Sequence, residues 1–464
     1  MEKLLQEILN ILDKVKSKRV VVIGDILLDE YIYGTVNKVS TGIKIPIVEK
    51  DCMEYRLGGA ANVAANVAGL CHNTILIGRC GNDDAGSMIK TICEKHGVEF
   101  IAYPAYKTTV KQRIYTDNQQ VFRLDSNYPM KSVYDELDDI LQKLATDVIV
   151  IADYLYGIIS QEVLDKIANY CERNNIILII SSRDLRRFKI NSVPIIVANQ
   201  KEWDLGGLSE TDVEAFITRG EKGIKYISKT EEIEQKAKEQ YPVNVSGAGD
   251  TVLAIIALLY GEDIDISILL RIANLAGGLA VIDKLTFVLT KQNLIDAIYE
   301  QWVNEDSINK IVDISLAWKI VSAWRNESKK IVFTNGCYDL LHLGHIKSFQ
   351  YSKKFGDKLV VAVNSDESIK RLKGKGRPIN NLEERVSTLA YLSMIDMVVP
   401  FYEDTAISVI EKIAPDTYIK GAEYKHRELL EAKYAKRVEY VPMIEGTSTT
   451  QLIKKITKAG ENVE

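Results

Sequence analysis

The chain has no excess of positive charge. Its 464 residues include 59 lysines and arginines against 64 aspartates and glutamates, which gives a formal net charge of -5 and a pI of about 5.8. A protein that binds a nucleic-acid backbone needs a basic patch to neutralise the phosphates. We therefore expect no nucleic-acid partner, although local sites can still bind small anions.

Long hydrophobic runs are also missing, although 46% of the residues are hydrophobic. No segment approaches the ~20 apolar residues that a membrane-spanning helix requires, so we expect no membrane partner. Residues 1–18 place apolar side chains on one helical face but include Glu2, Glu7 and Asp13. Such charges do not suit the apolar core of a secretory signal, so this segment is predicted to form a surface helix.

The six cysteines form no CxxC pair and show no spacing typical of metal ligands. They are Cys52, Cys71, Cys80, Cys93, Cys171 and Cys337. Isolated cysteines of this kind are typical of reduced thiols. We therefore expect a cytoplasmic protein without a structural zinc.

What the sequence does contain is a regular alternation of short apolar runs, such as residues 19–24 and 148–153, with helix-like segments. This alternation predicts an α/β fold with a doubly wound, mainly parallel sheet. Because 464 residues are too many for one core, we predict several domains. The first spans 1–303, a linker or helical lead-in spans 304–328, and a second α/β domain spans 329–464.

Two segments of the first domain, residues 31–49 and 108–125, contain short β-like pieces. The second segment has a turn signal at Asp117-Asn118, which predicts a hairpin. Together the two segments predict a small sheet that stands beside the main one as a lid.

Acidic residues and glycines follow the first apolar run. Asp25 and Asp29 come at its carboxyl end, where α/β proteins bind ligands. Further on, Gly58 and Gly59 open an alanine-rich helix that contains Asn62. The glycines predict either close helix packing or the approach of the backbone to a polar ligand, and the residues alone leave both open.

A glycine turn at residues 247–250, Gly-Ala-Gly-Asp, precedes a strongly apolar helix. Free amides at a helix N-terminus can bind an anion, and Asp250 can deprotonate a hydroxyl that attacks a phosphoryl group held there. The same pattern also suits an ordinary helix start with an acidic first turn. Upstream, Asn199 and Glu202 have an NxxE spacing suited to hydrated magnesium, and residues 218–223 form another glycine turn.

Together these motifs resemble the ribokinase-type sugar kinases over roughly the first 300 residues. The resemblance implies a ribokinase-like sheet with a small β lid, Asp250 as catalytic base and the amides of Gly247, Ala248 and Gly249 as anion hole. It implies sugar binding by Asp25, Asp29, Gly58, Gly59, Asn62 and Arg123, and nucleotide binding by Asn199, Glu202, Thr218, Gly220 and Gly223. It also implies Mg²⁺ held through water by Asn199 and Glu202. We expect a homodimer formed through the lid.

The second domain opens with an apolar strand that passes through a glycine turn into a helix with two histidines. His342 and His345 stand three residues apart with Gly344 between them, so both rings and the free amides can face one anion. Histidines that only cap the helix are the simpler alternative. A basic loop that contains Lys373 and Arg377 is either a solvated face or a clamp on a triphosphate.

This run, TNGCYDLLHLGH, resembles the HxGH signature of the nucleotidyltransferases related to cytidylyltransferases. The resemblance implies a Rossmann-like domain in which His342 and His345 stabilise the transition state. It implies nucleotide binding by Thr334, Asn335, Gly336, Asp339, Gly344, Asn364, Asp366, Lys373, Arg377, Lys420, Thr447, Ser448 and Thr449.

Fused in one chain, the two halves resemble the bifunctional heptose 7-phosphate kinase and heptose 1-phosphate adenylyltransferase family, which supplies ADP-heptose for lipopolysaccharide. The resemblance implies phosphorylation of heptose 7-phosphate at the anomeric hydroxyl and then adenylyl transfer to heptose 1-phosphate with release of pyrophosphate. ATP would be a substrate of both domains. Two alternatives stay open: a kinase and cytidylyltransferase for another sugar or polyol phosphate, or a degenerate kinase half that regulates an active nucleotidyltransferase.

The first domain departs from this family at three places. Ser181-Ser182-Arg183 stands where the family usually has Asp-Pro-Lys, Tyr156 replaces a lysine, and residues 40–43 replace Ser-Pro-Glu-Ala. We interpret these changes as a loss of cations and of an acid near a sugar phosphate, which leaves the sugar and the kinase rate open.

Overall fold

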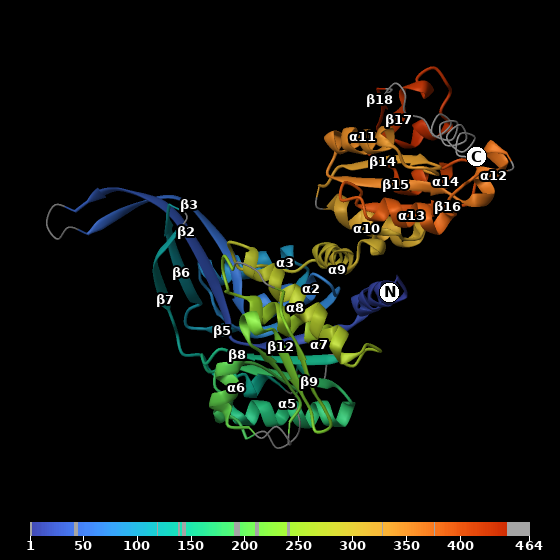
Figure 1. Ribbon diagram of the computed structural model, residues 1–464. Coiled ribbons are helices and arrows are strands. Elements are labelled where there is room, and N and C mark those ends of the chain that lie inside the picture. The colour runs from blue at the N-terminus through green and yellow to red at the C-terminus, as the bar shows by residue number, and fades with distance from the viewer. Residues whose placement is uncertain are drawn as a thin grey trace. The chain divides into compact units, whose positions relative to one another are not determined.

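The computed structural model (Figure 1) describes residues 2–40, 45–117, 119–137, 140–141, 145–189, 195–208, 213–238, 242–326, 328–374 and 376–442. The chain divides into two compact units. The N-terminal unit is Ile8–Leu294, and the C-terminal unit is Met1–Glu7 with Ile295–Glu464. Helices α1 (Glu2–Lys14) and α9 (Lys291–Glu305) each contribute residues to both units. Over the described ranges, no helix combines the length and apolarity needed to cross a membrane.

The N-terminal unit is built on a sheet in which nine strands are described, in the order β13-β12-β11-β10-β9-β8-β1-β4-β5. The strands are β1 (Arg19–Gly24), β4 (Asn73–Gly81), β5 (Val98–Ala105), β8 (Val148–Asp153), β9 (Ile177–Ser182), β10 (Ile195–Asn199), β11 (Ala215–Thr218), β12 (Ile224–Ile227) and β13 (Glu232–Gln235). Pairing is parallel from β5 to β11 and antiparallel only from β11 to β13. The predicted doubly wound, mainly parallel sheet is confirmed.

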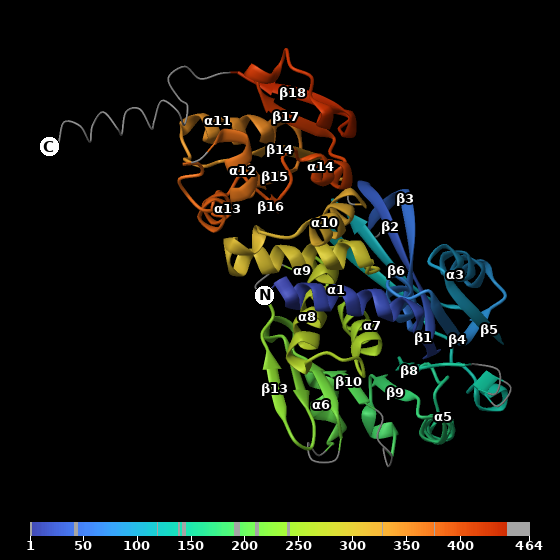
Figure 2. The same ribbon diagram turned by 90° about the vertical axis from the view of Figure 1, so that its right-hand side faces the viewer.

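Helices cover both faces of this sheet (Figures 1 and 2). They are α2 (Ala60–Ala68), α3 (Asp84–Lys95), α5 (Gln161–Asn174), α6 (Gln200–Gly206), α7 (Ala248–Leu259) and α8 (Ile266–Ile282). Val21 and Ile23 of β1 belong to the core cluster that includes Ile167 of α5, whereas α2 and α7 pack against each other. Because successive side chains of a strand point to opposite faces, burial on both sides explains the unbroken apolar run of β1.

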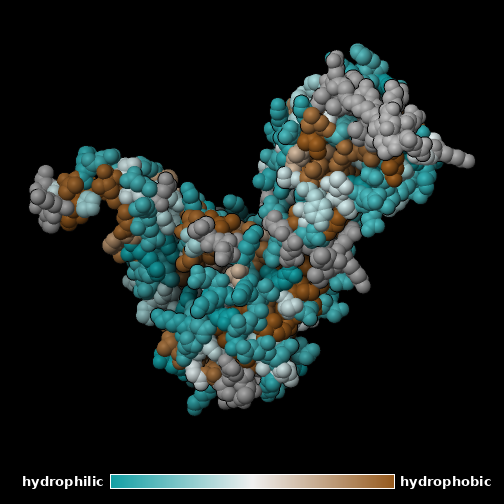
Figure 3. Space-filling model, in the orientation of Figure 1, coloured by the Kyte–Doolittle hydropathy of each residue, from teal (hydrophilic) through white to brown (hydrophobic). Residues whose placement is uncertain are grey.

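The predicted lid is a second sheet, with four described strands in the order β3-β2-β6-β7. Its strands are β2 (Ile26–Val39), β3 (Pro46–Gly59), β6 (Thr109–Thr116) and β7 (Gln119–Ser126). The β2–β3 hairpin extends well away from the main sheet (Figure 1) and carries apolar surface (Figure 3). Its exposed apolar side chains include Val36, Val39 and Ile47, and those of β7 are Val121, Phe122 and Leu124.

The C-terminal unit contains a parallel sheet whose five described strands run in the order β16-β15-β14-β17-β18. They are β14 (Ile331–Gly336), β15 (Lys358–Asn364), β16 (Met397–Phe401), β17 (Thr417–Gly421) and β18 (Arg437–Val441); the helices are α10 (Ile314–Asn326), α11 (Leu343–Ser352), α12 (Asp366–Lys373), α13 (Leu382–Ala390) and α14 (Ile407–Ile413). Helix α10, from the helical lead-in, packs against α14 and β16. The predicted Rossmann-like second domain is confirmed.

Candidate active sites

A cavity of the N-terminal unit lies where four neighbouring strands end. Asp153, Ser182, Asn199 and Thr218 are the last residues of β8, β9, β10 and β11, and all four line it. Gly249 and Asp250 of α7 also line this cavity. The predicted NxxE, Thr218 and GAGD residues are therefore brought together at the carboxyl edge of the sheet, where α/β folds bind ligands.

The start of α7 is shaped to receive an anion. Gly247 has φ 86°, a left-handed conformation, and a Cβ there would lie 2.9 Å from the side-chain nitrogen of Asn62. Ala248 then begins the helix, and a Cβ on Gly249 would meet no atom within 4 Å. The first amides of a helix have no intrahelical acceptor, so open space in front of them suits a phosphate.

The carboxylate of Asp250 is held by two side chains. The Tyr154 hydroxyl donates to Oδ1, and Asn62 Nδ2 donates to Oδ2 over 2.7 Å. Burial raises the pKa of Asp250, and these two bonds and the nearby Arg183 oppose that rise. The side chain remains partly exposed, so it is fixed in direction and still accessible to a substrate hydroxyl.

The predicted sugar-side acids are both buried, with different partners. Asp29 forms an ion pair with Arg113, which also donates to Ser246 Oγ over 3.3 Å. Asp25 accepts from the backbone amides of Tyr154 and two later residues of the same loop. Burial raises the pKa of Asp25 to about 6. Asp25 thus organises the loop that carries Tyr154, and a direct contact of Asp25 with a sugar stays a prediction.

Gly58 and Gly59 join the lid strand β3 to α2. A Cβ on Gly58 would lie 2.1 Å from Leu27, and Gly59 has φ 61° with its Cβ position 2.4 Å from the carbonyl oxygen of Asp25. Gly59 therefore requires glycine, whereas a side chain at Gly58 would have to displace Leu27. Of the two interpretations left open by the sequence, close packing is observed.

Arg113 and Tyr154 are site residues that sequence reasoning missed. The predicted Arg123 lies beside Arg113 in the lid, but its ion pair is with Asp125, 2.6 Å away. Lys111 stands two residues before Arg113 and therefore on the same face of β6. Its ammonium lies 5.9 Å from the ring centroid of Tyr156. The two cations at alternate positions, Lys111 and Arg113, were the available signal in the sequence. The acidic partner of Arg113, Asp29, can be identified only once β2 is known to pair with β6.

The NxxE residues form a capping box at the start of α6. Asn199 Oδ1 accepts from the Glu202 amide and Glu202 Oε2 accepts from the Asn199 amide, each over 2.9 Å. Glu202 Oε1 lies 2.7 Å from Arg183 Nη1. In the parts of the chain that are described, no group of three His, Cys, Asp or Glu could hold a metal. An amide and a carboxylate oxygen fit a Mg²⁺ that keeps its waters.

The nearby glycine turn follows β11. Gly220 and Gly223 both have positive φ, 59° and 87°, and a Cβ on Gly223 would lie 2.0 Å from the carbonyl oxygen of Gln235. Gly223 therefore allows β13 to approach this turn. At Gly220 a Cβ would meet no atom within 4 Å, so ligand space is open there.

Two of the three departures from the family pattern lie within the described residues. Ser182 Oγ donates to Asp153 over 2.6 Å, and Arg183 lines the cavity with Asn199 and Glu202. Arg183 thus keeps a cation at 181–183, on the side of the cavity where Asn199 and Glu202 lie, and the effect of this change on the sugar or the kinase rate stays a prediction. The ring of Tyr156 faces the lid, with the ammonium of Lys111 5.9 Å from its centroid. Residues 41–43 of the third departure lie outside the described residues.

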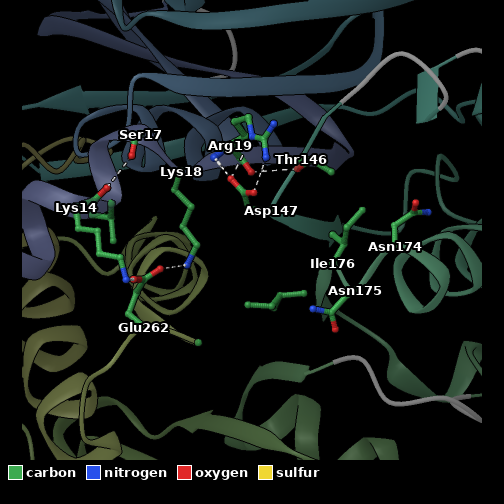
Figure 4. Close-up of a pocket in the computed structure, with 13 residues that line it drawn as sticks. Lys14, Ser17, Lys18, Arg19, Thr146, Asp147, Asn174, Asn175, Ile176 and Glu262 are labelled. Atoms are coloured by element: carbon green, nitrogen blue, oxygen red, sulfur yellow. Dashed lines mark hydrogen bonds and ion pairs between the residues drawn. The ribbon is translucent and has the colours of Figure 1, made fainter.

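A second pocket lies at the opposite end of the main sheet, where β1 and β9 begin (Figure 4). It has a volume of about 620 Å³. Its cations Lys14 and Lys18 are paired with Glu262, 2.7 Å and 3.1 Å away, and Arg19 is paired with Asp147, 2.7 Å away (Figure 4). None of the predicted site residues is among the described residues that line it, so we assign it no part in the chemistry.

In the C-terminal unit the HxGH turn follows β14, at the point where the strand order reverses. Strands β15 and β16 lie on one side of β14, and β17 and β18 lie on the other. Ligands of open α/β sheets bind at this switch point, outside the carboxyl ends of the strands. Gly336, Asn364 and Lys420 all lie at or next to strand ends there, and Gly344 is the second residue of α11.

The two histidines stack on each other at the start of α11. Their ring centroids are 3.9 Å apart, and the His342 amide donates to His345 Nδ1 over 3.4 Å. Burial lowers the pKa of His342, and it lowers the pKa of His345 to about 4, with His342 and Lys373 adding to the effect. Both rings are therefore neutral at pH 7. With Nδ1 accepting, His345 carries its proton on Nε2 and can donate it to a phosphate oxygen.

Several predicted nucleotide-binding residues are bonded to the surrounding loops. Asp339 accepts from the amides of Ile379 and Asn380, and its other oxygen lies 2.6 Å from Arg377 Nε. Asp366 pairs with the buried Arg385 over 2.7 Å. Arg377 is thus held by Asp339, and its contact with a triphosphate stays a prediction.

The remaining predicted residues lie around the same strand ends. Thr334 Oγ1 donates to a β17 carbonyl over 3.1 Å, Asn335 accepts from Tyr418 over 2.8 Å, and Asn364 is buried. Lys420 extends over the rings of Tyr418 and Tyr424, and burial lowers its pKa. Lys373 is exposed at the end of α12. The predicted residues Thr447, Ser448 and Thr449 lie outside the described residues.

Comparisons with known proteins match both halves. Residues 17–287 match the family described as pfkB family carbohydrate kinase, and residues 333–455 match the family described as cytidylyltransferase-like. The chain is similar to the bifunctional protein HldE of Haemophilus influenzae (strain PittEE), with 33% identity over 95% of this chain and 97% of the relative. The HldE of Campylobacter concisus (strain 13826) is also 33% identical, over 96% and 98%.

Among solved structures, phosphofructokinase-2 from Escherichia coli in complex with potassium matches with a TM-score of 0.50 and 15% identity. The match covers 60% of this chain and 97% of that one. At this identity it supports the fold of the N-terminal unit alone.

Proposed function

This chain belongs to the pfkB family of carbohydrate kinases and to the family of bifunctional HldE proteins, and from this premise we propose a heptose phosphate kinase and adenylyltransferase. It is a bifunctional enzyme with a kinase half and a nucleotidyltransferase half, and both halves use ATP. In our proposal the first half phosphorylates the anomeric hydroxyl of heptose 7-phosphate. The second half transfers AMP from ATP to heptose 1-phosphate and releases pyrophosphate.

The observation that carries the kinase proposal is the position of Asp250, one residue after Gly249 at the open start of α7. Asp250 takes the proton of the anomeric hydroxyl while that oxygen attacks the γ-phosphorus of ATP. Asn62 and Tyr154 hold the carboxylate in direction. The amides that begin α7 stabilise the charge on the transferred group, and ADP leaves.

We propose Mg²⁺ as the cofactor of this step. It would be held through water by Glu202 and Asn199, and it would neutralise charge on the triphosphate. Support comes from the amide and carboxylate oxygens that Asn199 and Glu202 place at this edge of the cavity.

For the second half we propose that His342 and His345 donate hydrogen bonds to the α-phosphate as heptose 1-phosphate attacks it. Their stacked, neutral rings at a helix start support this role. Lys373 and Arg377 would contact the departing pyrophosphate. Because the kinase product carries phosphates on both C1 and C7, the C7 phosphate has to be hydrolysed by another enzyme between the two steps.

We further propose a homodimer formed through the lid and a cytoplasmic location. The dimer would cover the exposed apolar side chains of β2, β3 and β7. The cytoplasmic location is supported by six free cysteines, four of which are buried.

The test is product analysis with purified protein. Heptose 7-phosphate and heptose 1-phosphate are supplied separately with each nucleoside triphosphate, and products are identified by mass spectrometry. We expect heptose 1,7-bisphosphate from the first sugar and ADP-heptose from the second. CDP-heptose as the main product would favour the cytidylyltransferase alternative. Sugar binding without phosphorylation of any sugar phosphate would favour a regulatory kinase half.

A further inference from the structure

The kinase cavity contains few positive charges. Among the described residues that line it, Arg183 is the only cation, whereas Asp153, Glu202 and Asp250 are acids. Asp153 is neutralised by Arg187, 3.0 Å away. A triphosphate that enters beside Glu202 and Asp250 meets like charge, and phosphoryl transfer adds charge at the γ-phosphate. Among the described lining residues, Arg183 is therefore the one cationic side chain that can compensate this charge, in addition to the amides of α7.

Arg183 still has donors available. Its side chain is 52% exposed, and its guanidinium makes one hydrogen bond, from Nη1 to Glu202 Oε1 over 2.7 Å. A guanidinium carries five N–H donors in a planar fork. Arg183 can therefore keep Glu202 on one edge and bind phosphate oxygens with the other.

Tyr154 places this guanidinium close to the reacting groups. The guanidinium carbon of Arg183 lies 5.2 Å from the centroid of the Tyr154 ring, and the hydroxyl of the same ring is bonded to Asp250. The guanidinium and the carboxylate of Asp250 are thus separated by one tyrosine side chain. The transferred phosphoryl group has to lie beside Asp250, which brings it within reach of Arg183.

We propose that Arg183 binds the γ-phosphate of ATP and stabilises the transferred phosphoryl group, an assignment that rests on the proposed kinase function. It binds in the fork geometry that arginine offers and lysine does not. Ser181-Ser182-Arg183 is then a local solution of this chain, in which one residue holds both the NxxE carboxylate and the phosphate.

The test compares Arg183→Met and Arg183→Lys with a matched control, Arg186→Met. Arg186 is exposed, pairs with Asp184 and is not among the residues that line the cavity. The probes are ADP and the β,γ-imido analogue of ATP, each with Mg²⁺. Because both units bind ATP, affinity for the kinase site is read from hydrogen–deuterium exchange of the peptide that covers the start of α7. Kinase kcat and melting temperature are measured on the same proteins.

We expect Arg183→Met to weaken the ATP analogue at least tenfold and ADP less than threefold, and to lower kinase kcat about 100-fold or more. Arg183→Lys should recover part of each loss, and Arg186→Met should behave as the unmodified protein. The assignment would be overturned if Arg183→Met weakened the binding of both nucleotides to the same extent. It would also be overturned if the ratio of the affinities for the ATP analogue and ADP stayed unchanged and kcat stayed normal.

The outcome also separates this assignment from the kinase proposal. One outcome is that the unmodified protein turns over no sugar phosphate while Arg183→Met still loses its preference for the ATP analogue over ADP. In that case the γ-phosphate contact is supported and the proposed reaction is contradicted. If turnover is normal in the unmodified protein and in Arg183→Met, the reaction stands and the contact fails. If neither nucleotide protects α7, both fail.

Discussion

The hydroxyl of Tyr154 donates a hydrogen bond to Oδ1 of Asp250. Tyr154 follows β8 directly, and Asp250 lies in the first turn of α7, so the bond joins two elements that are about a hundred residues apart in the chain. It holds the carboxylate that we propose as the base of the kinase reaction.

Replacing Asp250 by Asn should abolish phosphorylation of the sugar while adenylyl transfer to supplied heptose 1-phosphate continues. The reason is that Asp250 lies in the N-terminal unit and the HxGH turn lies in the other. Both rates are measured on one preparation. Equal loss of both activities would contradict the two-site model, and an unchanged kinase rate would remove Asp250 as the base.

Tyr154→Phe should shift the acidic limb of the kinase pH profile to higher pH. The Tyr154 bond stabilises ionised Asp250 and lowers its pKa, so the pKa rises when the bond is lost, and a higher pH is needed to form the base. Loss of orientation should also reduce kcat about tenfold, which is ~1.4 kcal/mol. Tyr134→Phe, at an exposed position, is the control. An unmoved profile would show that Tyr154 only fills space.

Tyr156→Lys should strengthen the kinase preference for a sugar that carries a distal phosphate. Lys111 already lies over the Tyr156 ring, and a second cation there adds a cation–phosphate contact of about 1.5 to 3 kcal/mol. The measurement is the ratio of kcat/KM for heptose 7-phosphate and related sugar phosphates. In the unmodified protein we expect this ratio to be lower than in relatives that have a lysine at the position of Tyr156. A ratio that does not change in Tyr156→Lys would place the distal phosphate elsewhere.

His342→Ala and His345→Ala should each slow adenylyl transfer about 100-fold or more, mainly in kcat. A donor directed at charge that develops in the transition state contributes roughly 3 to 4 kcal/mol, and ground-state binding of ATP should change less. The alternative, in which the histidines only cap α11, predicts a lower melting temperature of the C-terminal unit with kcat nearly unchanged. Kinetics and a thermal melt on the same variants distinguish the two.

The positions of both phosphate turns could be predicted from the sequence because each is a local event. At Gly336 an apolar strand leads through a glycine turn into a helix, and at Gly247 a polar turn does the same. Such a turn can be recognised from its own residues, without knowledge of tertiary contacts. The lid strands were harder to predict. Strand β2 begins at Ile26, directly after the Gly24-Asp25 break that ends β1, whereas the β-like pieces of the lid were predicted only from residue 31.

Contacts between distant elements could not be predicted in the same way. Arg113 is a site residue because β6 pairs with β2 and brings it to Asp29. The NxxE spacing was interpreted as a magnesium signal, yet the same spacing also makes a capping box, which is what Asn199 and Glu202 form. The pairing of Arg183 with Glu202 could not be predicted either, because Glu202 follows the next strand of the sheet.

Strand β3 of the lid passes through Gly59 into α2, and Asn62 in the first turn of that helix donates to Asp250. We therefore expect changes in chain length to be tolerated unevenly along the lid. An insertion at the far end of the β2–β3 hairpin leaves this junction in register. One extra residue between Gly59 and Asn62 would rotate the following helix by about 100° and carry the Asn62 amide away from the base. We therefore expect relatives to differ more in the length of the hairpin than in the spacing from Gly59 to Asn62.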